Sequence, residues 1–236
     1  MRLMTYNVQS GRDAWGQLRL DGCCEVINRL APDILGLNEL RKNCSDSGNV
    51  DQPSYIAEKT GLGHRFAKAI PMAGGEYGIG LFSRFPITEF GVFPVPEVPL
   101  GEREPGYYEP RVIYRGAVET PEGALAVYGT HFGLTRPERA YAVRLLAELL
   151  DKETLPHIFM GDLNMTPDDP LIGQIKRRLN DTHASRPMMT CHTLKLDETI
   201  DYIFVSGGIK ADTAMAHFSV ASDHLPVTCN ISLLHA

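Results

Sequence analysis

Five apolar runs in this sequence each end in a short polar cluster, and this repeated pattern constrains the fold more than any other feature. The clusters are Thr5-Tyr6-Asn7, Leu37-Asn38-Glu39, Gly129-Thr130-His131, Gly161-Asp162-Leu163-Asn164 and Ser222-Asp223-His224, with Ile200-Asp201-Tyr202-Ile203-Phe204 as a sixth. Each cluster supplies oxygen or imidazole groups that suit a hard metal ion or a phosphate. The pattern predicts that several strands converge their ends on one site.

Hydrophobic periodicity predicts an α/β protein built on two sheets. Strands are expected at 2–8, 33–37, 77–82, 87–92, 111–118, 124–129, 157–160, 200–205 and 226–233. Helices are expected at 23–30, from Pro53 to Gly61, at 135–150 and from Asp169 onward. Pro32 ends the first helix, and a capping box of Thr135 and Glu138 begins the third. Because the sequence contains no internal repeat or linker, we expect one domain over residues 1–236.

The segment 94–110 is predicted to be a long loop, because it is too rich in proline for a central strand. Long loops in compact domains are often functional. We therefore expect this segment to shape the substrate, with Tyr107 or Tyr108 contacting a phosphate or stacking on a ring. The alternative is a solvated loop with one ring tucked under it.

The charge balance argues against long nucleic acid as the main substrate. The formal net charge is −6 and the pI is about 5.7. Proteins that bind duplexes usually show a basic balance or a basic stripe, and neither is visible in the sequence. The balance stays acidic when four candidate site carboxylates are set aside: Glu39, Asp162, Asp201 and Asp223.

Other sequence features indicate a cytoplasmic protein without a membrane span. No stretch approaches the ~18 consecutive apolar residues of a transmembrane helix. The N-terminus passes directly into strand-like alternation and lacks the features of a signal peptide. The five cysteines are odd in number and show no Cys-x-x-Cys spacing, so we expect reduced and mostly buried thiols.

Asp162 and Asn164 are two residues apart, so their side chains point to the same side of an extended backbone. Gly161 allows the chain to turn sharply where the strand ends. A carboxylate beside an amide can hold or activate a water while the amide binds a phosphate oxygen. The alternative for this tetrapeptide is an Asx turn that closes a loop.

His224 follows Asp223 and precedes a predicted strand. A histidine titrates near neutral pH and can donate a proton or a hydrogen bond to a phosphoryl oxygen. It needs a carboxylate to orient it, and Asp201 on its own strand is the candidate. Alone, such a histidine is more often an ordinary structural residue, but within this set of clusters we favour a functional role.

Glu39 would be a costly charge at a buried strand end unless it is paired or bound to a metal. The competing interpretation is a surface ion pair with Arg41 or Lys42. His131 could equally be a core histidine with its hydrogen bonds satisfied, and Asn7 could be a cap.

Taken in order along the chain, the motifs resemble those of the endonuclease/exonuclease/phosphatase superfamily. The matching segments cover essentially the whole sequence and include Thr5-Tyr6-Asn7-Val8, residues 32–39, Ser83-Arg84-Phe85-Pro86-Ile87, Thr130-His131-Phe132, residues 161–167, residues 200–204 and residues 222–227. A single motif of this kind has little weight, whereas the ordered set is specific.

The resemblance implies a four-layer α/β sandwich, with two mixed β-sheets packed face to face and flanked by helices. It also implies hydrolysis of phosphate esters with Mg²⁺ or Mn²⁺. At the metal, the resemblance places Glu39 as the principal ligand, Asn7 beside it and Asp223 nearby. The oxygen-rich ligand set agrees independently, because carboxylate, amide and water suit these ions better than zinc.

For catalysis, the resemblance implies that Asp162 orients or deprotonates the attacking water. His224, oriented by Asp201, would stabilise the pentacovalent state. The positions matching phosphate-binding residues are Asn164 and His131 and, more loosely, Arg111.

Two positions depart from the family pattern. Asn38 precedes Glu39 where many members have glutamine, so the support of the metal ligand is expected to differ. Tyr6 precedes Asn7 where DNA-repair members more often carry tryptophan or phenylalanine.

The leading hypothesis is a divalent-metal-dependent phosphoesterase acting on a small or lipid-derived phosphate ester, assumed to be a monomer. An alternative keeps the chemistry and changes the substrate: a DNA-repair nuclease resembling exonuclease III. A third hypothesis is a binding module that keeps the fold without catalysis; degenerate members should lose carboxylates or the histidine, and here all are present.

Overall fold

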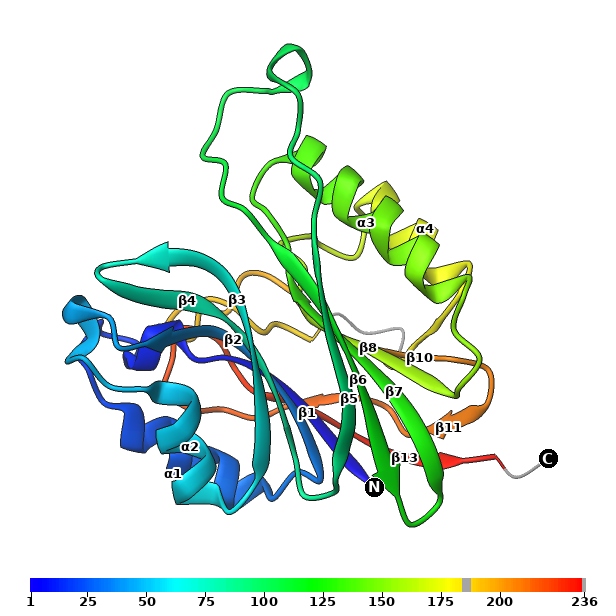
Figure 1. Cartoon of the computed structure of the whole chain (residues 1–236), viewed down its shortest axis with the longest axis horizontal. Coiled ribbons are helices and arrows are strands. Elements are labelled where there is room, and N and C mark those ends of the chain that lie inside the picture. Colours follow the sequence, from blue (N-terminus) through cyan, green and yellow to red (C-terminus); the bar gives the residue numbers. More distant parts are fainter. Residues whose placement is uncertain (184–187, 235–236) are drawn as a thin grey trace.

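Two mixed β-sheets pack face to face in the computed structural model, which describes residues 1–183 and 188–234 (Figure 1). The first sheet has the order β11 (Ile209–Ala211), β13 (Val227–Leu233), β1 (Arg2–Asn7), β2 (Ile34–Lys42), β4 (Gly75–Ser83) and β3 (Gly63–Met72), with β12 (Met215–Ala216) also paired to β13. The second has the order β5 (Ile87–Pro94), β6 (Val112–Thr120), β7 (Gly123–His131), β8 (His157–Asp162), β10 (Asp201–Val205) and β9 (Asn180–Asp181). The pairs β1–β2 and β7–β8 are parallel and the other pairs are antiparallel.

Helices cover the outer face of each sheet. The helices α1 (Leu20–Leu30) and α2 (Gln52–Thr60) lie on the first sheet, and α3 (Arg136–Leu150) and α4 (Pro170–Lys176) lie on the second. Three apolar clusters fill the spaces between layers. The central one joins the two sheets through buried side chains such as Ile34, Tyr114 and Met160. The expected four-layer α/β sandwich is confirmed.

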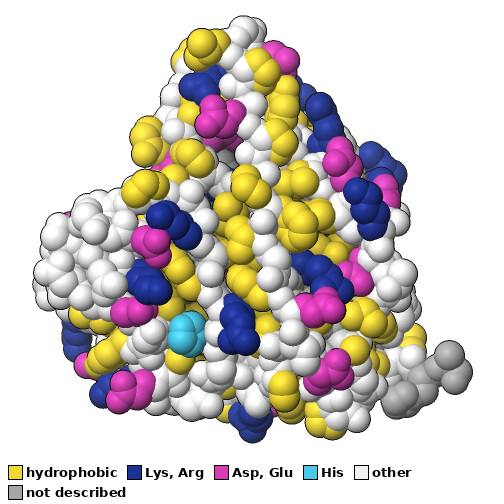
Figure 2. Space-filling view, in the orientation of Figure 1, with side chains coloured by type: hydrophobic (Ala, Val, Ile, Leu, Met, Phe, Trp, Pro, Cys, Tyr) yellow, Lys and Arg dark blue, Asp and Glu magenta, His cyan; other side chains and the backbone are white. Residues whose placement is uncertain are grey.

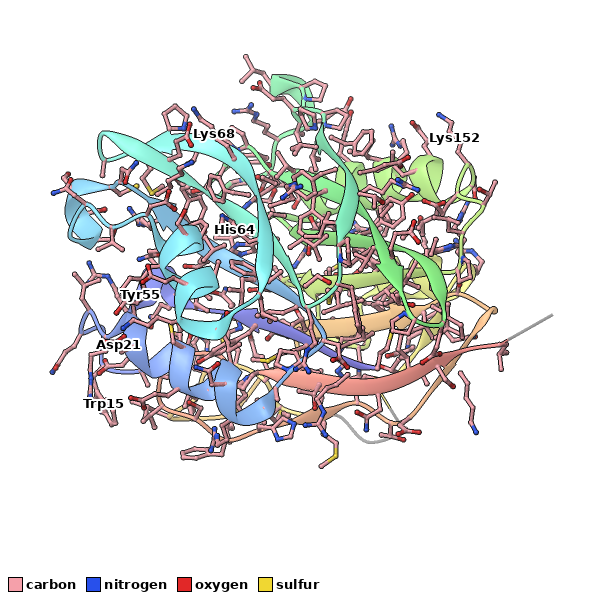
Figure 3. The ribbon with its side chains drawn as sticks, turned by 60° about the horizontal axis from the view of Figure 1, so that its bottom comes forward. Trp15, Asp21, Tyr55, His64, Lys68 and Lys152 are labelled. Carbon is pink, nitrogen blue, oxygen red and sulfur yellow. The ribbon has the colours of Figure 1, made fainter. Side chains whose placement is uncertain are left out.

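The local signals for the helices act as predicted. Pro53 lies in the first turn of α2, and Gly61 ends it with a left-handed φ of 70°. At α3, Thr135 and Glu138 form a complete capping box. The first two helices are linked by Tyr55, whose hydroxyl donates to the Asp21 carboxylate at 2.6 Å (Figure 3).

Three features differ from the sequence expectation. The sequence pattern does not predict strand β3, although it predicts the neighbouring β4. It also does not predict the short strands β9, β11 and β12. Gly161 lies inside β8 instead of at a turn after it. There it has a φ of 149°, and a Cβ atom would collide with the Thr130 carbonyl oxygen of β7, so the close approach of two strands requires glycine.

The structure also describes the state of the cysteines and the character of the helices. All five cysteines are free and buried, as predicted. Among the described residues, no helix combines the length and apolar character that crossing a membrane requires.

The Glu153 carboxylate lies where β6, β7 and the end of α3 meet, and it accepts hydrogen bonds from four residues. Its donors are Arg115 Nε at 2.8 Å, the Tyr128 hydroxyl at 2.8 Å, and the Thr154 and Leu155 amides at 3.0 Å. Burial alone would raise the pKa of Glu153, but these partners outweigh burial and hold the pKa at about 2.

We predict that Gly129→Ala destabilises the fold. A Cβ atom at Gly129 would overlap the ring of Tyr114, which is buried between the sheets and cannot move without disturbing both. The unfolding free energy should fall by about 3 kcal/mol, as for other overpacked cores. Chemical denaturation measures this. Gly173→Ala in α4 is the matched control, because nothing lies within 4 Å and it should not destabilise. Equal effects of both substitutions would contradict the packing argument.

We predict that Glu153→Gln removes a pH-dependent part of the stability. Because the folded pKa lies below the unfolded value of 4.5, the carboxylate contributes fully above pH 4.5 and loses its contribution as pH falls toward 2. The difference in unfolding free energy from wild type should be at most about 3 kcal/mol at pH 6 and vanish near pH 2. Denaturant titrations across this range test it, with the exposed Glu58→Gln as control. A difference that does not change with pH would refute the assignment.

Candidate active site

Strand register places three predicted site residues side by side on the second sheet. His131 of β7 is paired with Asp162 of β8, and Asp162 is paired with Asp201 of β10. Since paired residues on adjacent strands point to the same face, the three side chains form a row across the sheet. All three are buried, with Asp162 1% and Asp201 0% exposed.

The first sheet contributes two asparagines that are register partners, Asn7 of β1 and Asn38 of β2. Asn38 links the two sheets directly: its Nδ2 donates to the Thr130 carbonyl at 2.6 Å, and its Oδ1 accepts from the Asp162 amide at 3.3 Å. The residue that departs from the family pattern therefore bridges the sheets and makes no hydrogen bond to Glu39.

Glu39 reaches the site because β2 contains a bulge. The register between β2 and β4 shifts between Leu37 and Leu40, and Glu39 has a left-handed φ of 60°. This conformation is uncommon for a residue other than glycine and costs of the order of 1–3 kcal/mol. The surface pairing considered for Glu39 is not formed, because Arg41 pairs with Asp46 and Lys42 with Asp51.

The Asn7 amide joins the two sheets at their carboxylates. Its Nδ2 donates to Glu39 Oε1 at 2.9 Å and to Asp162 Oδ2 at 3.0 Å. Its Oδ1 accepts from the Gln9 backbone N–H at 3.0 Å, which fixes the orientation of the Asn7 side chain. The nitrogen of Asn7, and not its oxygen, therefore faces the carboxylates.

His224 lies against the same carboxylate row. Its Nδ1 is 2.9 Å from Asp201 Oδ2, and its Nε2 is 3.7 Å from Asp162 Oδ2. Burial alone would lower the pKa of His224, but Asp201 outweighs burial and raises it well above the usual value. This arrangement favours the imidazolium form and fixes the ring.

The Arg111 guanidinium orients His131. Arg111 Nη1 is 3.1 Å from His131 Nδ1 and 2.9 Å from Glu109 Oε1. Since arginine can only donate, His131 Nδ1 accepts, and its proton is on Nε2, which is 3.6 Å from Asp162 Oδ2. Burial, and then the charge of Arg111, lowers the pKa of His131 well below its usual range, so this ring is neutral.

The remaining predicted residues are less closely engaged. The Asn164 amide donates to the Phe132 carbonyl, and its backbone N–H closes an Asx turn on Asp162 Oδ1 at 3.0 Å. Asp223 contributes to the raised pKa of Glu39, after burial, but its side-chain hydrogen bond is to Ser222. Tyr107 is exposed, and Arg84 pairs with Asp33 at the surface.

Tyr108 is tucked into the 94–110 loop. Its hydroxyl bonds with the backbone of Glu104, and the Arg103 guanidinium covers its ring at 4.8 Å. This is the arrangement considered as the alternative to substrate stacking.

The donor set fits a hard divalent cation. Glu39, Asp162 and Asp201 bring three carboxylates together, of which Glu39 is half-buried and the other two are buried. Asp201 Oδ1 has no hydrogen-bond partner in the described structure. Ligand atoms of Asp162, Asp201 and His224 lie within 4.8 Å of one another. Asp201 bonds to His224 through Oδ2, and Glu39 accepts from Asn7 through Oε1. Both Asp162 oxygens accept hydrogen bonds, one from Asn7 and one from the Asn164 backbone N–H. Oxygen donors of this kind suit Mg²⁺ or Mn²⁺.

Sequence reasoning missed three residues that contact the site. Cys191 Sγ lies 3.4 Å from His224 Nε2, and Glu109 pairs with Arg111. Burial, and then the charge of Glu39, raises the pKa of Tyr77. Glu109 is separated from Arg111 by Pro110 only, so an ion pair could have been inferred. Nothing in the sequence around Cys191 or Tyr77 indicates their positions.

Solved structures share this fold over nearly the whole chain. An endonuclease/exonuclease/phosphatase from Beutenbergia cavernae has a TM-score of 0.81 at 23% identity, covering 99% of this chain and 71% of that one. A mannosyl-6-phosphatase from Bacteroides thetaiotaomicron has a TM-score of 0.77 at 19% identity, covering 99% and 100%. The human nocturnin catalytic domain, with bound sulfate, has a TM-score of 0.70 at 19% identity, covering 99% and 93%.

Family membership follows from the sequence. No curated protein matches the chain significantly. The model of the Endonuclease/Exonuclease/phosphatase family, however, matches residues 4–224, which include every residue of the site described above. The chain belongs to the endonuclease/exonuclease/phosphatase family.

Proposed function

We propose that this protein is a divalent-metal-dependent phosphoesterase that hydrolyses a small or lipid-derived phosphate ester with an activated water. The observation that carries the proposal is the Asn7 amide, which holds Glu39 and Asp162 from opposite sheets beside the Asp201–His224 pair. A surface cluster would not bring three carboxylates together with two of them, Asp162 and Asp201, fully buried, because burying carboxylates is costly and such groups gather at functional sites.

Glu39 is the principal ligand for Mg²⁺ or Mn²⁺ in this proposal, with Asn7 and Asp223 beside it. The strained backbone at Glu39 supports this role, because such strain persists only where the surrounding structure enforces it. When bound, the cation supplies neutralisation of phosphate charge and support for the leaving oxygen.

The chain's own residues position the reactants. Asp162 orients the attacking water and takes its proton at the carboxylate, as the water oxygen bonds to phosphorus and the ester bond breaks. His224, fixed at Nδ1 by Asp201, presents Nε2 to a phosphoryl oxygen. His131, Asn164 and the Arg111 guanidinium bind the other phosphoryl oxygens.

A small substrate agrees better with the surface than a duplex does. On the face shown in Figure 2, the Lys and Arg side chains lie among Asp and Glu side chains and form no continuous stripe. Duplex binding depends on many phosphate contacts to basic residues. The net charge of −6 points the same way.

We predict that Asp162→Asn or His224→Ala abolishes hydrolysis. Asp162→Asn keeps the shape of the side chain but removes the proton acceptor, and His224→Ala removes the donor to the phosphoryl oxygen. Each should lower kcat for bis-p-nitrophenyl phosphate in Mn²⁺ at least about 100-fold. Release of p-nitrophenolate measures it. Asp212→Asn, at an exposed position, is the control. Retained activity in either site variant would overturn the assigned roles.

We predict that Glu39→Gln weakens metal binding. The amide keeps the volume of the side chain but removes its negative charge, so Mn²⁺ affinity measured by titration calorimetry should fall at least about tenfold. Glu76→Gln, which alters a surface pair with Lys68, serves as the matched control and should leave affinity unchanged. If wild type binds neither Mg²⁺ nor Mn²⁺, the binding-module hypothesis replaces the enzyme.

A further inference from the structure

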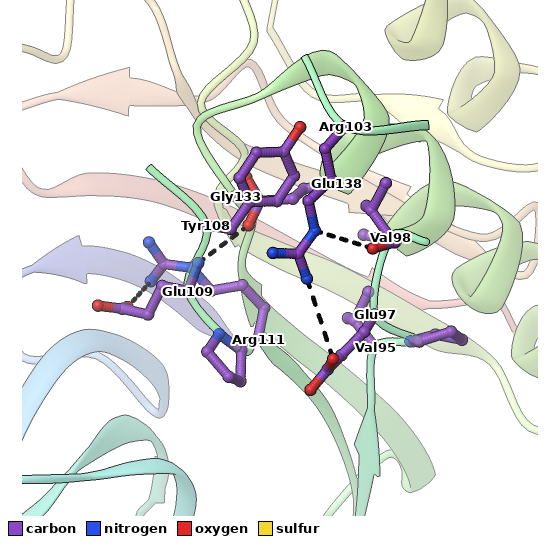
Figure 4. A pocket seen from close by; sticks show the side chains of 12 residues that line it. Val95, Glu97, Val98, Arg103, Tyr108, Glu109, Arg111, Gly133 and Glu138 are labelled. Atoms are coloured by element: carbon purple, nitrogen blue, oxygen red, sulfur yellow. Dashed lines mark hydrogen bonds and ion pairs between the residues drawn. The ribbon is translucent and has the colours of Figure 1, made fainter. Parts of the chain in front are cut away.

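A cavity of about 170 Å³ lies beneath residues 95–110, the segment that we call the arm (Figure 4). The arm links β5 to β6 and projects from the body beside α3 (Figure 1). One wall of the cavity comes from the arm and the other from the first turns of α3. Its apolar lining consists of Val95, Pro96, Val98, Pro110 and Ala142.

Two charged residues that line this cavity, Arg103 and Glu138, are already engaged with neighbouring groups. Arg103 Nε donates to the Val98 carbonyl at 3.0 Å, and its guanidinium covers the Tyr108 ring. Glu138 accepts from Thr135 and, at 3.1 Å, from the Glu109 amide. A ligand rich in hydroxyl groups would find few free partners here, whereas an apolar group would lose no hydrogen bonds on entry.

Arg111 connects the cavity to the proposed catalytic centre. Its side chain is 8% exposed and lines the cavity, while its Nη1 lies 3.1 Å from His131. Its Nε is buried without a hydrogen-bond partner in the described structure. A buried donor of this kind is costly unless it meets an acceptor. A phosphoryl oxygen bound there would leave the group attached to the phosphate at the mouth of the cavity.

We propose that this cavity receives the organic group of the ester, and that this group is compact and apolar, about the size of one aromatic ring. The inference rests on the proposed function and deepens it. The size follows from the volume, because an apolar protein cavity of about 150 Å³ accommodates benzene. Specificity then arises from the apolar walls, while Arg111 and His131 bind the phosphate.

Phosphonates test the cavity without requiring turnover. Titration calorimetry of the Mn²⁺-loaded protein should show phenylphosphonate binding at least about tenfold more tightly than methylphosphonate. Two variants narrow the cavity from opposite walls: Ala142→Leu on α3 and Val98→Phe on the arm. In both variants, the ratio of the phenylphosphonate affinity to the methylphosphonate affinity should fall to near one. Methylphosphonate should still bind, which also shows that the fold is intact. Ala147→Leu, on the same helix but in a separate groove, should keep the wild-type preference.

The outcomes separate this inference from the proposed function. Equal binding of both phosphonates by wild type, or a preference that survives in a narrowed variant, would overturn the inference. An equal gain from glycerol 1-phosphate would also overturn it, because that group is polar. A wild-type preference for phenylphosphonate without hydrolysis of any phosphate ester would uphold the cavity and remove the enzyme.

Discussion

The Asn7 amide, with one N–H directed to each of two carboxylates, is the interaction on which the rest of this site depends. Glu39 and Asp162 come from different sheets, and their negative charges repel each other at a site where Asp162 is buried and Glu39 is half-buried. As a donor that both carboxylates share, Asn7 offsets part of the cost of bringing their charges together. Because the Gln9 backbone N–H donates to the Asn7 amide oxygen, the Asn7 side chain is held with its nitrogen toward the carboxylates. The first strand thus orients the carboxylates of both sheets.

The packing of the two sheets gives this arrangement its rigidity. Asn38 of β2 donates to a backbone carbonyl of β7 and accepts from a backbone amide of β8, so its side chain joins inner strands of the two sheets through main-chain groups that move little. The central apolar cluster holds the sheets together below the site. A rigid frame of this kind can maintain the strained backbone at Glu39, which a loop would release.

Sequence reasoning selected residues that the structure brings together, because the strands that carry them have strong local signals. Apolar runs that end at Asn7, Glu39 or Asp162 mark where strands present polar groups, and the order of these motifs indicated the family. The orientation of Glu39 was not predictable, because it depends on a bulge that only the pairing with β4 reveals. The bridge by Asn38 and the contact of Cys191 with His224 likewise join residues distant in sequence.

Glu138 links the arm to the candidate active site. Its carboxylate completes the capping box of α3 and also accepts the Glu109 amide, so the base of the arm is fixed to the start of the helix. Gly133 must be small there, because a Cβ atom would lie 2.6 Å from the Glu138 side chain. Glu109 in turn pairs with Arg111, and Arg111 orients His131. A group that fills the cavity under the arm would therefore contact the same short series of residues that positions His131, one of the proposed phosphate-binding residues. Under the proposed function, sequence changes in the arm would alter which ester fits while the carboxylate row on the second sheet stays unchanged.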